Sequence, residues 1–260
     1  MSLTRNIELC GIETCVDTVL EAEKDVFTDL ELKRQTWTMP NVKADADIRN
    51  SEQIHACFSR IIALSLNLEL PVGSFVRAFL EQEKQLPMSA KIGLINNIKD
   101  EEKHQIAFEN ILKAYSVTEK DCVTANNYRK LLVKDKTHPL IKSRDMETII
   151  FIPLQTCLRY YGSQSLERLV GYISLDEIRH LNYNWELSEI LGLGFNREFE
   201  DSLVSICQWC FEPLKNITLD SEFWIESTYQ MREDGESENL INIMDYGIGV
   251  APFEISNNNY

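Results

Sequence analysis

Two short motifs in this chain place a glutamate three residues before a histidine. Glu101 and His104 form the first motif, and Glu177 and His180 form the second. On an α-helix, side chains at positions i and i+3 lie on the same face, so each motif offers one carboxylate and one imidazole to a single point. The chain has four histidines, and two of them stand in this arrangement. The motifs therefore predict two sets of metal ligands.

Two further glutamates enlarge the ligand set. Glu69 and Glu147 each lie inside a strongly apolar run of the sequence. An ionised carboxylate buried there without a partner is costly, and a metal ion would remove that cost. Glu101 follows Glu69 by 32 residues, and Glu177 follows Glu147 by 30. Both spacings fit an antiparallel pair of helices that brings its two ligands to one level.

Together these six residues match the ligand set of a dinuclear site inside a four-helix bundle. Four carboxylates and two imidazoles suit iron or manganese better than a metal that prefers thiolates. The predicted metal ligands are Glu69, Glu101, His104, Glu147, Glu177 and His180.

Helical periodicity along nearly the whole chain predicts an all-α scaffold for this site. We expect core helices at about 51–83, 89–115, 141–161 and 165–191, with shorter helical segments at about 13–32, 119–133 and 196–214. No segment alternates polar and apolar residues as a strand does. Residues 1–230 are predicted to form one helical domain, and residues 231–260 a polar C-terminal tail or arm.

Composition argues against some classes of binding partner and indicates the cellular compartment. A net charge of −15 argues against nucleic acid and anionic membranes, since both attract basic surfaces. The most apolar run, 61–76, is interrupted by Asn67, Glu69 and Pro71, which disfavours a membrane span. The N-terminus lacks the apolar stretch of a signal peptide. Seven scattered cysteines indicate free thiols in a reducing compartment, and Cys207 and Cys210 form a lone CxxC. We expect a cytoplasmic protein.

The same residues resemble the ferritin-like superfamily of di-iron carboxylate proteins. The likeness is greatest to the small, radical-generating subunit of ribonucleotide reductase and its relatives, and it spans about residues 37–186. Residues 147–151, Glu-Thr-Ile-Ile-Phe, are similar to that family's Glu-Gly-Ile-Phe-Phe ligand segment. Residues 175–180, Leu-Asp-Glu-Ile-Arg-His, are similar to its Arg-Asp-Glu-x-x-His segment. The resemblance implies a ferritin-like four-helix bundle with additional peripheral helices.

The resemblance also implies roles for two residues outside the ligand set. Asp176 matches the family's aspartate that precedes the last ligand glutamate, and Trp37 matches its upstream tryptophan. In the family this pair hydrogen-bonds to a metal-bound histidine and carries an electron towards the site. A carboxylate that anchors the outer nitrogen of a ligand histidine is also expected on physical grounds. The alternatives are a solvated helix position for Asp176 and simple packing for Trp37.

Other positions depart from the family pattern. Phe108 stands where the family has its radical-bearing tyrosine, which excludes a tyrosyl radical there; some relatives with this phenylalanine use one Mn and one Fe ion. Phe151 and Ile173 match the apolar lining of the family's site. Ile173 also replaces the extra histidine ligand of the arylamine N-oxygenase branch. Gln155 replaces an apolar residue, and it either orients a substrate or bonds to the backbone.

Three functions follow as expectations from the motifs and the resemblance. The preferred one is an O2-activating oxidoreductase, an oxidase or oxygenase, that acts on a small apolar substrate with two Fe ions or one Mn and one Fe. The second is a radical-generating subunit without the usual tyrosyl radical, docked on a large reductase subunit through the tail. The third is a non-enzymatic iron-binding protein. Relatives of this kind are commonly homodimers, and the sequence does not identify the electron donor.

Overall fold

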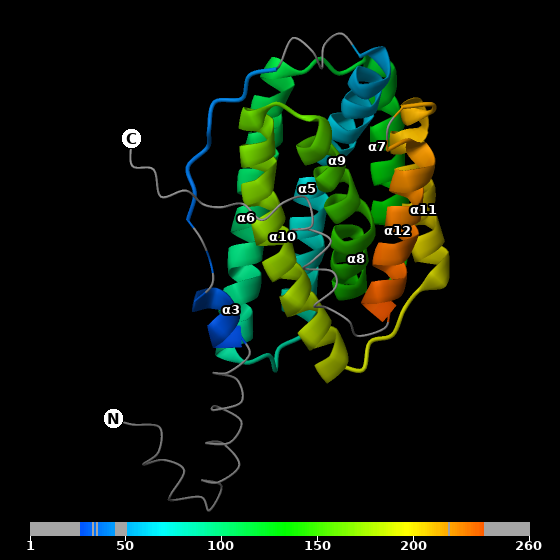
Figure 1. The fold of residues 1–260 in the computed structure, drawn as a ribbon. Coiled ribbons are helices and arrows are strands. Elements are labelled where there is room, and N and C mark those ends of the chain that lie inside the picture. Colours follow the sequence, from blue (N-terminus) through cyan, green and yellow to red (C-terminus); the bar gives the residue numbers. More distant parts are fainter. Residues whose placement is uncertain (1–26, 33, 35, 45–50, 218, 237–260) are drawn as a thin grey trace, which may run out of the picture.

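The chain folds into helices packed around a central bundle (Figure 1). The computed structural model describes residues 27–32, 34, 36–44, 51–217 and 219–236. This part of the chain contains helices and no strand, which confirms the all-α class predicted from the sequence. The bundle consists of α5 (Glu52–Gln82), α6 (Met88–Ala114), α10 (Gln164–Ile190), and a third rod formed by α8 (Pro139–Met146), η2 (Glu147–Phe151) and α9 (Ile152–Tyr161).

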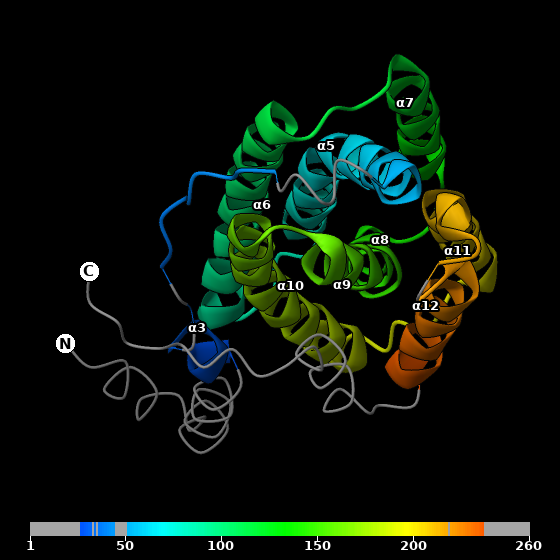
Figure 2. The ribbon, with the colours of Figure 1, turned by 45° about the horizontal axis from the view of Figure 1, so that its top comes forward.

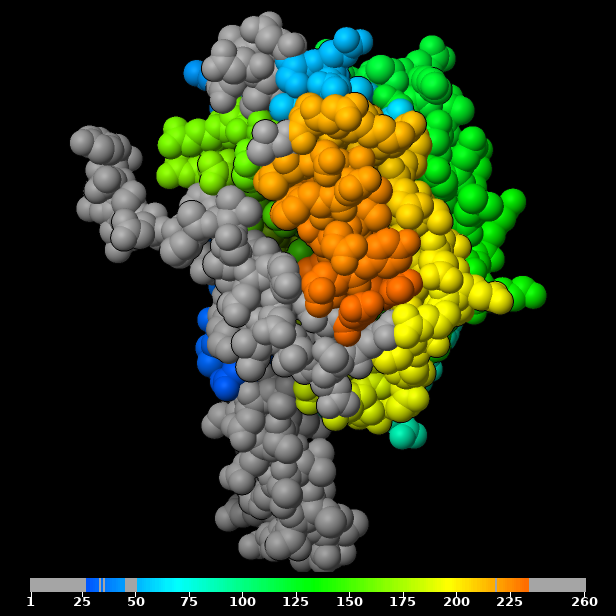
Figure 3. All heavy atoms as spheres, turned by 45° about the vertical axis from the view of Figure 1, so that its right-hand side comes forward, coloured from blue at the N-terminus to red at the C-terminus, as the bar shows by residue number. Residues whose placement is uncertain are grey.

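The remaining helices flank this bundle (Figure 2). They are α3 (Asp29–Leu32), α7 (Glu119–Lys134), α11 (Arg197–Phe211), η3 (Glu212–Leu214) and α12 (Ser221–Glu236). The last two long helices, α11 and α12, pack side by side at the surface (Figure 3). The predicted core helices agree with the observed ones to within two residues at each end. Of the expected segment 13–32, only 27–32 lies within the described residues.

The central helix α5 is the most apolar element of the bundle. Most of its residues from Cys57 to Phe79 are buried, and the helix continues through Pro71. By length and composition alone α5 could span a membrane, but 61% of its most apolar window is buried inside the protein. A core helix passes the same test, so its hydropathy is accounted for by its position.

The contact between α6 and α10 depends on one glycine. A Cβ atom on Gly93 would lie 2.3 Å from the ring of Tyr183, so only glycine lets this ring lie directly on the α6 backbone. The Tyr183 hydroxyl then donates to the carbonyl of Phe27 at 2.7 Å. Because α6 and α10 carry the two Glu-x-x-His motifs, this close packing helps to set the distance between them.

The third rod of the bundle contains a feature that the sequence reading did not anticipate. We expected one continuous helix over 141–161, but residues Glu147–Phe151 form a π-helical turn between α8 and α9. The turn ends two residues before Pro153, which has no N–H to donate to a regular helix. Single π turns often mark functional sites, and this one begins at a predicted metal ligand, Glu147.

The predicted boundary at residue 230, between the helical domain and the tail, falls inside α12. This helix continues to Glu236, and Met231 is buried against Ile152, Ile178 and Leu181. An apolar side chain at 231 therefore belongs to the folded part of the chain, in spite of the polar sequence around it. Residues 237–260 of the predicted tail lie outside the described residues.

Candidate metal centre

The six predicted ligands converge on one point inside the bundle. Each is at most 1% exposed. Two overlapping groups have ligand atoms within 4.8 Å of one another. The first group, here called the Glu69 half, contains Glu69, Glu101, His104 and Glu177. The second group, the Glu147 half, contains Glu101, Glu147, Glu177 and His180. Glu101 and Glu177 belong to both groups, so the two halves share these carboxylates.

Both histidines direct the same ring nitrogen into the site. His104 Nδ1 lies 3.3 Å from a Glu177 oxygen and 3.6 Å from a Glu69 oxygen. His180 Nδ1 lies 3.0 Å from a Glu101 oxygen and 3.2 Å from the other Glu177 oxygen. Each Nε2 atom therefore points outward, where an anchoring group can hold the ring in place.

Two aspartates supply these anchors in a crossed arrangement. Asp176 Oδ2 lies 3.3 Å from Nε2 of His104, and Asp100 Oδ2 lies 3.5 Å from Nε2 of His180. Each aspartate precedes the ligand glutamate of one motif and contacts the histidine of the other. The sequence reading identified Asp176 but missed Asp100. The signal was present, because both motifs read Asp-Glu-x-x-His with a basic residue before the histidine.

Buried arginine holds the two aspartates. The Arg179 guanidinium donates to Asp100 and, at 3.4 Å, to Asp176, and Arg34 donates to Asp100 at 2.7 Å. Burial alone would raise the pKa of Asp100, but His180 and the two arginines lower it below its usual value. Asp100 is therefore an anion whose charge is shared by several partners.

The structure also brings Trp37 to the site. Its indole N–H donates to Asp176 Oδ2 at 2.8 Å, the oxygen that also contacts His104. The Lys103 ammonium lies 3.5 Å from the centre of the Trp37 ring and donates to the Trp37 carbonyl at 2.8 Å. Neither the solvated position considered for Asp176 nor packing alone for Trp37 describes these contacts. The electron-carrying role of the pair stays a prediction.

Burial and crowding shift the protonation of the ligands. Burial raises the pKa of Glu69 and of Glu147 well above the usual value, because it penalises the charged carboxylate. For His104 and His180, burial alone would lower the pKa, but the neighbouring carboxylates outweigh it and raise the pKa well above normal. Glu177 differs: burial would raise its pKa, but the two histidines lower it to about 2. In the metal-free protein, protons held by these side chains therefore balance the negative charge of the carboxylates, which metal cations would otherwise balance.

Unsatisfied ligand atoms provide a test of whether this site fits metal ions. Within the described chain, both oxygens of Glu69, both oxygens of Glu101 and His104 Nδ1 are buried without a hydrogen-bond partner. Buried polar atoms are nearly always hydrogen-bonded in proteins. Glu69, Glu101 and His104 each place one ligand atom within 4.8 Å of the others, so a cation among them would give all three residues a partner. The donor set, four carboxylates and two imidazoles, fits two divalent iron or manganese ions.

The predicted pocket residues are all buried, and one of them, Gln155, is polar. Phe108, Phe151 and Ile173 are buried in the same apolar cluster. Gln155 donates to a Glu177 oxygen at 3.3 Å and accepts from Ser174 at 2.8 Å. Of the two roles considered for Gln155, a bond to the backbone is not the observed contact. Its amide nitrogen is instead directed at a ligand carboxylate.

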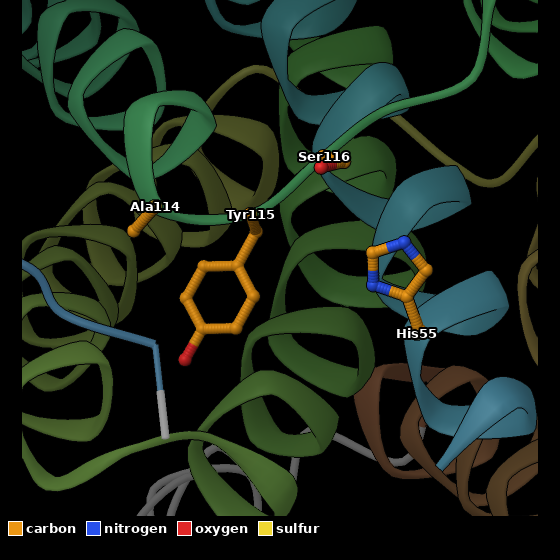
Figure 4. A pocket seen from close by; sticks show the side chains of 4 residues that line it. All are labelled: His55, Ala114, Tyr115 and Ser116. Atoms are coloured by element: carbon orange, nitrogen blue, oxygen red, sulfur yellow. The ribbon is translucent and has the colours of Figure 1, made fainter. Parts of the chain in front are cut away.

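A separate pocket of about 420 Å³ lies at one end of the bundle. Tyr115 and His55 stand on either side of it, with Ala114 and Ser116 completing the lining (Figure 4). His55 precedes Glu69 by 14 residues, or about 21 Å along α5, so this pocket is not part of the metal centre.

Five cysteines in the described chain are free, including Cys207 and Cys210.

Comparisons with known proteins leave the site to be interpreted by its own chemistry. The chain matches no protein-family model, no curated protein and no solved structure.

Proposed function

We propose that this protein is an O2-activating dinuclear metal oxidoreductase with a ferritin-like bundle of the ribonucleotide reductase small-subunit type. One observation carries the proposal: six buried ligands from four helical segments meet in two overlapping groups, with the unpartnered atoms of one group facing inward. Two Fe ions, or one Mn and one Fe, supply the electrons and the open coordination positions for reduction of O2 when bound.

The surrounding residues have separate tasks in this proposal. Asp176 and Asp100 fix the ring orientation of the two ligand histidines. Phe108, Phe151 and Ile173 exclude water from the ligands and form the wall against which a small apolar substrate would lie. Water exclusion matters because it strengthens the electrostatic interactions inside the site. The substrate itself is not identified by these apolar side chains.

A radical-generating subunit is the second candidate, and a specific contact favours it. The hydrogen bonds from Trp37 to Asp176 and the contact from Asp176 to His104 connect a ligand to the half-exposed surface around Lys103. Such a chain would pass electrons between the site and a partner protein, here a large reductase subunit. A homodimer and an electron donor belong to both candidates as proposals. An iron store without enzymatic activity is the third candidate, and it needs no such chain.

Metal binding by single-residue variants tests the proposal. Anaerobic dialysis against excess Fe(II) is expected to leave about two Fe ions per chain in the unmodified protein. The Glu101→Gln variant should lose most of this metal, because Glu101 belongs to both halves. Its matched control is Glu102→Gln, since Glu102 is the neighbouring residue and is exposed, with a long contact of 3.9 Å to Arg77.

The second part of the experiment separates binding from reaction. After addition of O2, the loaded protein is expected to consume O2 in proportion to its metal content, and the Glu102→Gln control should do the same. A metal content well below two ions per chain at saturation would refute the dinuclear site. Full metal content without O2 consumption would favour the iron-binding protein over both redox candidates.

A further inference from the structure

The unsatisfied atoms of the metal centre are not evenly distributed. Glu69 and His104 belong only to the Glu69 half, and three of their ligand atoms are buried without a hydrogen bond from any described residue. The shared ligand Glu101 adds two more such atoms. An unsatisfied buried polar atom costs the full loss of its hydration. A cation entering this half therefore relieves a cost and breaks no hydrogen bond of Glu69.

In the Glu147 half, both oxygens of Glu147 already accept hydrogen bonds from protein side chains. One Glu147 oxygen accepts from the Ser143 hydroxyl at 2.9 Å, and the other accepts from the Asn184 amide at 2.8 Å. Asn184 also donates to Ser143 at 3.1 Å, so the two donors form one buried group. These donors withdraw electron density from the carboxylate and stabilise it without a metal. A cation in this half gains less from Glu147 than one in the other half gains from Glu69.

The aspartates that anchor the two ligand histidines also favour metal binding in the Glu69 half. Asp176 lies 3.3 Å from His104, whereas Asp100 lies 3.5 Å from His180. Asp100 contacts two guanidinium groups, those of Arg34 and Arg179, whereas Asp176 contacts only that of Arg179 among the described arginines and accepts the neutral indole N–H of Trp37. A carboxylate anchor raises the basicity of the histidine that it contacts, and an anchor already neutralised by two cations does so less. His104 is therefore the stronger donor of the two ligand histidines.

From these three differences we propose that the two halves bind metal in a fixed order. The Glu69 half binds the first ion tightly, and the Glu147 half binds the second ion more weakly, with Asn184 and Ser143 setting the affinity of the second step. This inference rests on the dinuclear site of the proposed function. In this proposal Asn184 donates to the ligand Glu147 and thereby lowers the affinity for the second ion.

Anaerobic titration with Mn(II) at fixed pH, followed by the EPR signal of free Mn(II), measures both steps. For the unmodified protein we expect two dissociation constants that differ at least about tenfold, the factor that one hydrogen bond to a charged group supplies. Glu69→Gln should remove the tight step. Glu147→Gln should keep the tight step and remove the weak one. The metal-free forms of all variants are checked for folding by circular dichroism.

Two variants test the role of the buried donors. Asn184→Leu frees a Glu147 oxygen, so the second dissociation constant should fall about tenfold while the first stays unchanged. Ser143→Ala, a smaller change, should shift the second constant in the same direction. The matched control is Asn182→Leu on the same helix, since Asn182 donates to the Ile178 carbonyl of its own helix and to no other described residue. The control should move neither constant.

The outcomes separate this inference from the function on which it rests. Two Mn(II) ions bound with equal affinity would overturn the fixed order and leave the dinuclear site standing. Loss of the tight step in Glu147→Gln, or an unchanged second constant in both Asn184→Leu and Ser143→Ala, would also overturn it. No Mn(II) binding at all would refute the metal centre and the order together.

Discussion

Replacing Glu69 by leucine is expected to stabilise the metal-free protein. Glu69 is completely buried in α5, and neither of its oxygens has a hydrogen-bond partner among the described residues. Leu68 and Val72, its neighbours in the helix, are also completely buried. A leucine at this position would thus enter an apolar environment that the glutamate enters at a cost. The substitution removes a ligand of the Glu69 half at the same time, so it should also abolish the stabilisation by metal bound in that half.

The magnitude follows from three contributions. An unsatisfied buried polar group costs about 1–3 kcal/mol, and a buried leucine side chain gains about 1.5–3 kcal/mol. The branched leucine side chain does not match the shape of the glutamate that it replaces, and this strain lowers the free energy of unfolding by about 1–3 kcal/mol. The net gain is about 2 kcal/mol, and a chain of this size then unfolds at a temperature about 4–8 °C higher. Metal at about 100 times its dissociation constant stabilises the unmodified protein by about 2.7 kcal/mol, a gain that the variant loses.

Thermal unfolding followed by circular dichroism measures both effects. Each protein is melted with EDTA and again with excess Mn(II). The control is Glu81→Leu, an exposed position on the same helix, where the change in stability should stay within about 0.5 kcal/mol. The reasoning would be wrong if the metal-free Glu69→Leu variant melted below the unmodified protein. It would also be wrong if Mn(II) raised the melting temperature of both by the same amount.

Two further predictions concern pH and packing. In the folded, metal-free protein the pKa is raised for Glu69, Glu147 and the two ligand histidines. The folded state therefore holds protons that the unfolded state releases, and stability should fall from about pH 5 to about pH 8. Urea unfolding in EDTA measures this fall. With metal bound, the ligands carry no proton in the folded state, so stability should instead rise with pH over this range. Gly93→Ala places a Cβ 2.3 Å from the Tyr183 ring and should cost about 1–3 kcal/mol; equal urea midpoints would contradict the close packing.

The helices of the bundle were predictable because their signals are local. Apolar residues recur with helical period, and Pro87, Pro139 and Gly162 stand where helices begin or end. The burial of Glu69 and Glu147 was predictable for a related reason, because each stands alone inside an apolar run of the sequence. Both inferences use only neighbouring residues, and a single sequence contains that information.

The parts that escaped prediction depend on contacts between helices. Asn184 and Ser143 look like ordinary polar helix residues, and only the fold shows that both donate to Glu147. Asp100 could have been found by comparing the two motifs, but its histidine partner lies in the other motif. The π turn at Glu147–Phe151 has no period of its own over five residues. Met231 shows the reverse case, since a polar sequence around it hides a buried side chain.

The crossed aspartates make the two halves of the site parts of one structure. Asp100 and Asp176 each lie beside a ligand glutamate on one helix and contact a ligand histidine on the other, and Arg179 contacts both aspartates. A shift of α6 against α10 would therefore move both histidines at once. So many buried charges seldom add stability compared with apolar side chains of similar size. Their presence is explained if the bundle maintains a site for cations, where the ligands must keep their positions whether or not metal is bound.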